Sequence, residues 1–338
     1  MAHEIQENDS MFSVGETPWH GLGVVLDSPP TILEGLEKAN LNWTVRLLPL
    51  FCQIPVQGSG RRTAGEYYEV TNRAVLREDT NEILGIVGAN YTILQNTEAF
   101  KIFEPLVESK DLLLETAGSL KNGRRVWILG RINAEGAEIG KGDEVRPYVL
   151  LSNSHDGTMA VRFGFTPVRV VCNNTLSIAE EGKTSKLIKI IHTQGVHESL
   201  DALRNMLDIA KESFTTTIEQ YKWLASRDIN ERDLAQYVKV VFQPDFEQIG
   251  VNVQGQVFDE GGEIIFTPSE KKVIELFESG IGSGMPKAKT WWGAYNSVNE
   301  FLMYHRGRDV SNRLNSVWFA DGYKWNQTAL NVAIKMAA

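Results

Sequence analysis

Two neighbouring residues, His155 and Asp156, could carry out acid–base chemistry in the segment SNSHDGT. A histidine titrates near neutral pH, and an adjacent carboxylate can orient its ring. The same segment is also typical of a tight turn, in which Asp156 bonds to nearby amides and Gly157 takes a positive φ. Because adjacent side chains of a strand point in different directions, we favour the turn and keep the acid–base pair as an alternative.

A second group of residues combines cations with aromatic rings in the segment VRFGFTPVRVVCNN. Here Arg162 and Arg169 could bind phosphate groups, and Phe163 or Phe165 could stack on bases. The two arginines are seven residues apart, so a regular strand would place them on opposite faces unless Pro167 introduces a bulge. A structural role is the alternative, with arginines that pair with acidic neighbours and phenylalanines that belong to the core.

The overall charge of the chain argues against nucleic-acid binding, because phosphate binding depends on Lys and Arg. Its 338 residues have a formal net charge of −9. The charge is unevenly distributed, however: residues 1–120 hold 8 Lys and Arg against 17 Asp and Glu, residues 121–192 hold 11 against 7, and residues 193–338 hold 15 against 19. We therefore expect a cationic surface in the middle region. Its candidate phosphate contacts are Arg124, Arg125, Arg162, Arg169, Lys186 and Lys189.

The composition, with 42% hydrophobic and 23% charged residues, is that of an ordinary globular protein. There is no apolar run of the roughly 18 residues that a membrane helix needs, and the first residues lack signal-peptide features, so we expect a cytoplasmic protein without a membrane partner. Cys52 and Cys172 lie far apart between apolar neighbours, which predicts buried free thiols. The scattered histidines lack zinc-site spacing, and we expect no metal or cofactor.

The central region, which carries these candidate residues, has the pattern of an antiparallel sheet. LLLETAGSL and RRVWILGRI flank Lys121-Asn122-Gly123, and Asn-Gly is the strongest short hairpin signal. EVRPYVLLSNS and MAVRFGFTPVRVVC flank His155-Asp156-Gly157 in the same way, and SKLIKIIHT adds a fifth β-type segment. We expect a meander of about five strands, with a short helix at 174–179 before the last one. Parallel βαβ units are disfavoured because the intervening helices are missing.

The segments around this sheet complete an α+β protein. After an irregular N-terminal stretch, Thr31 and Glu34 form a capping-box pattern at the start of a short helix. WTVRLLPLFCQI and YYEVTNRAVLRED read as hairpin partners, and an amphipathic helix starts near Asn96 or Thr97. Apolar periodicity predicts further helices at 196–225, 231–241, 270–278, 291–304 and 326–337.

Three regions follow from this pattern. Residues 1–40 form an N-terminal arm with a short helix, and residues 41–192 form the antiparallel sheet core. Residues 193–338 form a mainly helical region that we expect to pack on the same core. Within it, residues 243–268 lack periodicity and are interpreted as a flexible excursion.

Four longer segments carry a family resemblance: TPWHGLG, YTILQNTEAF, LLSNSHDGTMAVRFGFTPVRVVCNNTL and KTWWGAYNSVNEFLMYHRGR. Together they resemble the phage/plasmid-like protein family built around a large domain of unknown function (domain of unknown function 932), over about residues 10–330. The resemblance implies an origin in phage, plasmid or integrated mobile DNA and no assigned chemistry. The hairpin-rich centre is also similar in topology, more loosely, to Rad52-like single-strand annealing proteins, which is an analogy of fold.

Three functions remain open from the sequence. The first is a non-enzymatic nucleic-acid-binding protein that binds or anneals single-stranded DNA in recombination, as a homo-oligomer. The second is an enzyme acting on a small molecule or nucleotide, which would need a pocket containing the His155-Asp156 loop. The third is a factor that interacts with host proteins against defence systems. We expect the first, and hence no catalytic residues.

Overall fold

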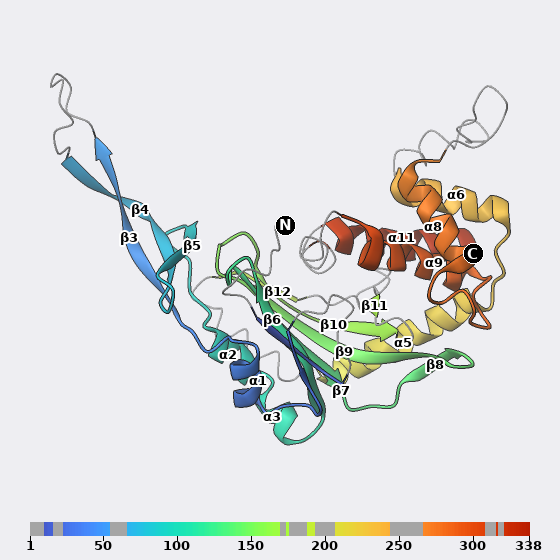
Figure 1. Cartoon of the computed structure of the whole chain (residues 1–338), viewed down its shortest axis with the longest axis horizontal. Helices are drawn as coiled ribbons and strands as arrows, with labels where there is room; N and C mark the ends of the chain where they lie inside the picture. The colour runs from blue at the N-terminus through green and yellow to red at the C-terminus, as the bar shows by residue number, and fades with distance from the viewer. Residues whose placement is uncertain are drawn as a thin grey trace.

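The computed structural model describes residues 10–15, 23–54, 66–169, 174–175, 188–192, 207–243, 266–307, 316 and 321–338. Two sheets and a group of C-terminal helices make up these parts of the chain (Figure 1). Both sheets are antiparallel apart from one parallel pair, which confirms the predicted α+β class. Within the described ranges, every helix is too short or too polar to span a lipid bilayer.

The main sheet contains the predicted meander. Its strands are β1 (Met11–Val14), β2 (Val24–Leu26), β6 (Leu112–Leu120), β7 (Arg125–Ile132), β8 (Ala137–Gly140), β9 (Asp143–Ser154), β10 (Val161–Arg169), β11 (Asn174–Thr175) and β12 (Ile188–Ile190). Their order across the sheet is β11-β10-β9-β7-β6-β1-β2, with β12 beside β10 and β8 beside β9. The predicted hairpins are therefore confirmed as β6–β7 and β9–β10.

The two hairpin turns have the backbone that their sequences predict. Between β6 and β7, Lys121, Asn122 and Gly123 all have positive φ, at 57°, 58° and 89°. Between β9 and β10, Gly157 has a φ of 73°. This left-handed conformation is accessible to glycine at no steric cost and to asparagine at little cost, which explains why these residues stand at the turns.

Two local predictions for the main sheet are wrong. The N-terminal stretch expected to be irregular supplies β1, which pairs antiparallel with β6, and β2, which pairs parallel with β1. These strands have four and three residues, too few for an alternating pattern to stand out. Asn174–Thr175, expected to begin a helix, forms β11 because the chain turns back and pairs with the end of β10. Residues 176–179 lie outside the described residues.

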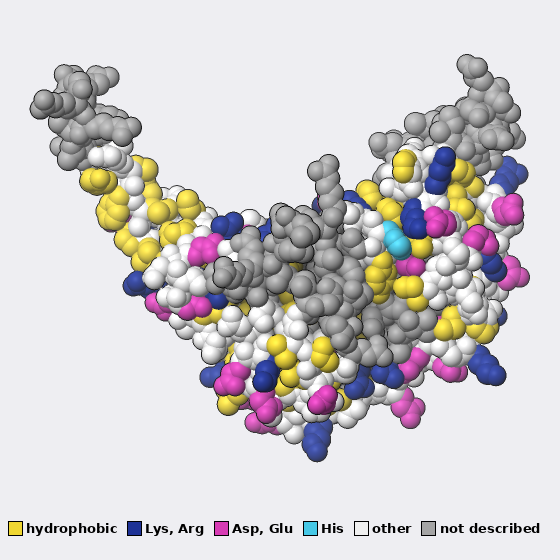
Figure 2. Space-filling model, viewed as in Figure 1, with side chains coloured by type: hydrophobic (Ala, Val, Ile, Leu, Met, Phe, Trp, Pro, Cys, Tyr) yellow, Lys and Arg dark blue, Asp and Glu magenta, His cyan; other side chains and the backbone are white. Residues whose placement is uncertain are grey.

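A second sheet forms an arm that projects from the body (Figure 1). It contains β3 (Val45–Ile54), β4 (Glu66–Arg77) and β5 (Glu82–Val87) in that order. The predicted β3–β4 hairpin is confirmed, while its turn lies outside the described residues. Large apolar side chains along this arm are exposed (Figure 2): Phe51, Tyr67, Tyr68, Ile83 and Ile86.

The arm also corrects the prediction of two buried cysteines. Cys52 lies on β3 and is an exposed free thiol. Its apolar neighbours in LFCQI suggested burial, but on a projecting two-stranded ribbon they have no core to pack against. Cys172 lies outside the described residues.

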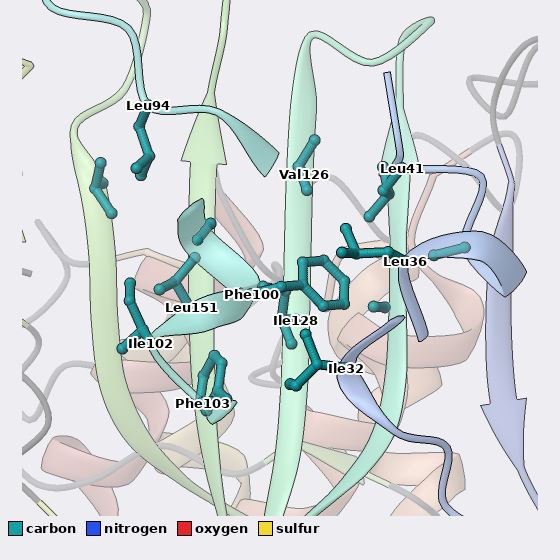
Figure 3. Packing of buried hydrophobic residues seen from close by; sticks show 14 of the residues in the cluster. Ile32, Leu36, Leu41, Leu94, Phe100, Ile102, Phe103, Val126, Ile128 and Leu151 are labelled. Atoms are coloured by element: carbon teal, nitrogen blue, oxygen red, sulfur yellow. The ribbon is translucent and has the colours of Figure 1, made fainter. Parts of the chain in front are cut away.

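One face of the main sheet is covered by three short helices. They are α1 (Ile32–Lys38), α2 (Asn96–Lys101) and α3 (Glu104–Glu108). Figure 3 shows Ile32 and Phe100 packed against the sheet residues Val126 and Ile128, and all four belong to one buried cluster. The predicted capping box is confirmed at α1, where the Thr31 N–H donates to the carboxylate of residue 34 at 2.8 Å.

The C-terminal helices form a second buried cluster. They are α5 (Leu207–Ala225), α6 (Glu231–Phe242), α8 (Pro268–Ser279), α9 (Trp291–Glu300), the π-helical segment η3 (Phe301–His305) and α11 (Asp321–Ala337). Each overlaps a predicted helical segment, although α11 begins five residues before the predicted range 326–337. Residues 193–206 and 244–265 lie outside the described residues. The cluster reaches the main sheet, because the Trp292 indole N–H donates to the Asp143 carboxylate at 2.9 Å.

A buried ion pair joins two of these helices. Lys239 on α6 and Glu270 on α8 are both buried, and their Nζ and Oε2 atoms lie 2.7 Å apart. The Glu270 carboxylate also accepts hydrogen bonds from Gln243 Nε2 at 3.0 Å and from the Thr267 N–H at 2.7 Å. These bonds offset the desolvation of the carboxylate, which is the condition for a buried charge to be tolerated.

Candidate nucleic-acid interface

Two of the predicted arginines lie on the face of the main sheet opposite to α1–α3. In the ladder, Arg125 on β7 is opposite Ser154 on β9, and Ser152 lies between Trp127 and Arg162. Directly paired residues share a face and successive residues alternate, so these side chains share one face, and the core residues of β7 lie on the other. β9 thus separates the two arginines by a single strand that presents serines.

The guanidinium of Arg162 is half-buried, and no carboxylate among the described residues pairs with it. In the part of the chain that the structure describes, its Nε atom is buried without a hydrogen bond. Burial is the largest effect on the pKa of Arg162 and lowers it, Tyr323 acts in the opposite direction, and the positive charge of Arg125 lowers the pKa further. The lowered pKa indicates that the charged form of Arg162 is disfavoured at this position. A bound anion would relieve this cost.

The other cations near this end of the sheet have carboxylates close by. Arg124 lies 3.9 Å from the Glu82 carboxylate, which is a loose contact at a partly exposed site. Arg125 lies near Asp156: although burial raises the pKa of Asp156, hydrogen bonds from Ser154 and Thr158 and the charge of Arg125 lower it overall.

Further along the sheet, two other cations of the net-positive region are neutralised directly. Arg131 lies 2.6 Å from the Glu115 carboxylate, and Arg146 lies 2.8 Å from that of Glu144. The structural alternative considered from the sequence therefore holds for these two arginines. Arg162 differs from them because no carboxylate of the described residues reaches it.

The structure describes the other three predicted phosphate contacts, Arg169, Lys186 and Lys189, only in part. The register of β10 with β9 runs without a shift from Arg162 to Arg169, so the bulge considered at Pro167 is absent from this pairing. Lys189 on β12 is paired with Arg162 in the ladder. The side chains of Arg169 and Lys189, and all of Lys186, lie outside the described residues.

The predicted base-stacking residues occupy core positions. Phe163 is 6% exposed, and its ring centroid lies 6.0 Å from that of Phe103. Phe165 packs edge-on against Phe214 of α5 at 5.9 Å. Both lie on the face opposite to Arg162, because neighbouring residues of a strand alternate. This geometry corrects the stacking assignment and favours the core alternative.

The side chains of His155 and Asp156 make separate sets of contacts. His155 is 1% exposed, its Nε2 lies 2.9 Å from Asn96 Oδ1, and its ring meets Trp43 edge-on at 5.3 Å. Asp156 accepts hydrogen bonds from the Ser154 hydroxyl and from the Thr158 N–H, the latter at 2.9 Å. The carboxylate therefore organises the turn, which is the interpretation favoured from the sequence.

A pocket of about 360 Å³ lies beside this turn and was not anticipated from the sequence. It is lined by residues 88–91, 157–160 and 191–192, and neither His155 nor Asp156 is among them. The rings of Tyr91 and His192 stack in its wall, with centroids 4.6 Å apart and an angle of 19°. The Tyr91 hydroxyl donates to the Ser154 carbonyl at 3.0 Å, and His192 Nδ1 donates to the Thr92 carbonyl at 3.1 Å.

The pocket had no single signal in the sequence. Its three lining segments are separated by 65 and 30 residues, and only the pairing of the strands brings them together. The Tyr91–His192 stack joins the first segment to the last, so neither residue stood out by its own context.

Comparisons with known proteins give one match. The family model described as "Domain of unknown function (DUF932)" matches residues 83–318, which is more than half of the chain. The matched range contains Arg124, Arg125, Arg162 and the pocket, and it excludes β3 and β4 of the arm. No curated protein and no solved structure matches.

Proposed function

The chain belongs to the family of the domain of unknown function DUF932, and because that description assigns no activity, we propose a function from the site itself. In this proposal the protein binds single-stranded nucleic acid, with its phosphates on the face of the main sheet that carries Arg125 and Arg162. One observation carries it: Arg162 is a half-buried cation without a carboxylate partner among the described residues.

For phosphate binding, the charges close to the site matter more than the net charge of the chain. The charge of −9 acts on a ligand at long range and is screened beyond about 10 Å at 0.1 M salt. In this proposal the phosphate binds the exposed part of the Arg162 side chain, because Trp127 and Ser152 beside it on this face are buried. Guanidinium groups bind phosphate through two parallel hydrogen bonds, which are among the stronger ones in proteins.

A single strand suits the recessed position of Arg162 better than a duplex does. Duplex phosphates lie on a stiff cylinder, so they reach protruding cations most easily. An unpaired strand can bend its backbone towards a half-buried side chain.

The test is the affinity for a fluorescent oligothymidine, followed by anisotropy at low and high salt. We expect salt-sensitive binding, and we expect Arg162→Ala to weaken it about tenfold and to reduce the salt slope by about one. Arg46→Ala is the matched control, because Arg46 lies on the arm, is exposed and carries the same charge. Absence of binding at low salt, or an equal loss in both variants, would contradict the proposal.

The other functions considered from the sequence gain less from this geometry. An enzyme that uses the His155-Asp156 loop would need both side chains at a pocket, and the pocket beside the turn is lined by other residues. Self-association and a host partner stay predictions. The exposed apolar side chains of the arm form the surface on which self-association and binding of a host protein can be tested.

A further inference from the structure

The pocket lies at the same end of the sheet as the cations of the proposed interface. Ala160 lines the pocket, and Arg162 follows two residues later on β10. Ile191 also lines it, and Lys189 precedes it by two residues on β12. Arg125 is paired with Ser154, whose carbonyl accepts the hydrogen bond from the Tyr91 hydroxyl. A ligand that contacts Arg125 and Arg162 therefore lies at the end of the sheet where the pocket opens.

The size and the walls of the pocket suit a flat, mostly apolar group. Its volume of about 360 Å³ falls within the range of small-ligand sites. Tyr91 and His192 each use a polar atom to bond a backbone carbonyl, which holds the stacked rings in place before any ligand arrives. A fixed aromatic wall is the usual platform for an unpaired base.

The polar groups at the rim are few and neutral. The side chains of Asn90 and Thr158 are exposed there, and an amide can bond to the edge of a base. Burial and the charge of Asp156 raise the pKa of Tyr91, so its hydroxyl stays protonated and keeps its bond to Ser154. No described lining residue is a Lys, Arg, Asp or Glu, so the pocket does not provide a charged side chain for a phosphate.

We propose that this pocket takes one unstacked nucleobase of the strand whose phosphates lie along the sheet face. The inference rests on the proposed function and deepens it, because it explains why an unpaired strand would be preferred over a duplex. A stacked and paired base cannot enter the pocket without leaving its helix. Since every base has a flat face, we expect only a weak preference among bases.

Gly88 offers a position at the pocket where a side chain can be added without a clash at its Cβ atom. A Cβ atom built on Gly88 would meet no atom within 4 Å, although the residue lines the pocket. Gly88→Leu should therefore place its side chain in open space at the pocket and weaken binding of oligothymidine by about fivefold or more. Gly284→Leu is the matched control, because Gly284 also has open space around its Cβ position and does not line this pocket. We expect this control to bind like the unaltered protein.

A second measurement uses the unaltered protein, so that it does not depend on the folding of a variant. Oligothymidine is compared with an oligonucleotide of equal length whose central positions are abasic, which keeps the phosphates and removes bases. We expect weaker binding of the abasic strand by the unaltered protein, and equal binding of both strands by Gly88→Leu.

The outcomes separate the two proposals. Equal affinity of the unaltered protein for both strands, with a loss in Arg162→Ala, overturns the base pocket and leaves the phosphate interface standing. The base pocket is also overturned, and the phosphate interface stands, if Gly88→Leu still prefers strands with bases while its thermal unfolding is unchanged. Absence of any binding, or no effect of Arg162→Ala, overturns both.

Discussion

His155 should make the stability of this protein depend on pH. The ring is buried, with Asn96 bonded to Nε2 and Trp43 against its edge. Burial and the charges of His192 and Arg77 lower the pKa of His155 from 6.5 to about 3, although Asp156 acts in the opposite direction. The folded protein therefore holds this histidine neutral over a range in which the unfolded chain binds a proton.

The sign and the size of the effect follow from this difference. Between pH 6.5 and 3 the unfolded state binds more protons than the folded state, so the free energy of unfolding falls as the pH falls. One proton corresponds to about 1.4 kcal/mol per pH unit, which amounts to about 2 kcal/mol between pH 7 and pH 5. Burial also lowers the pKa of His192, which adds a contribution of the same sign.

Urea unfolding at pH 7 and pH 5 measures the effect. His155→Gln keeps an amide that can bond to Asn96 and removes the titrating ring, so its loss of stability on acidification should be about 2 kcal/mol smaller than that of the unaltered protein. His305→Gln is the control, because His305 is exposed. If His155→Gln loses as much stability as the unaltered protein between the two pH values, His155 is not the group that makes the stability depend on pH.

Two further predictions concern stability and use the same urea assay. Lys239→Met leaves the Glu270 carboxylate buried without its cation and should cost about 3–5 kcal/mol, whereas adding Glu270→Gln should recover more than half of that loss. A double variant that is no more stable than Lys239→Met would contradict this. Gly85→Ala would place a Cβ 2.6 Å from the Asp156 Cα and should cost about 1–3 kcal/mol, while Gly88→Ala, which meets no atom, should change stability by less than about 0.5 kcal/mol. If Gly85→Ala and Gly88→Ala change the free energy of unfolding equally, the contact of the added Cβ atom with Asp156 does not destabilise the protein.

Local signals predicted much of the fold. The Asn122-Gly123 turn, the Asp156-Gly157 turn and the Thr31 capping box each depend on residues close in the sequence, and all three appear in the structure. Neighbouring residues of a strand lie on opposite faces, so the sequence alone places Arg162 and Phe163 on opposite faces of β10. This rule would have excluded Phe163 as a stacking residue for a nucleic-acid strand that binds at Arg162.

Features that depend on distant contacts could not be predicted. The four residues of β1 form a strand because β6 lies on one side of them and β2 on the other. Cys52 is exposed because its hairpin projects beyond the core, although its neighbours are apolar. The Tyr91–His192 stack joins residues about 100 positions apart. Burial and pocket formation depend on where strands lie, which a single sequence does not encode locally.

The position of β1 in the main sheet has a consequence for how the chain folds during synthesis. Met11 of β1 pairs with Gly118 of β6, so this ladder can form only after roughly 100 further residues have been synthesised. Until then β1 can pair only with the three-residue strand β2, and its later pairing with β6 closes one of the longest loops in the sheet, a late step in a topology of high contact order. Before that closure β6 is an open edge strand of nine residues, and the nascent protein is open there to pairing with other chains.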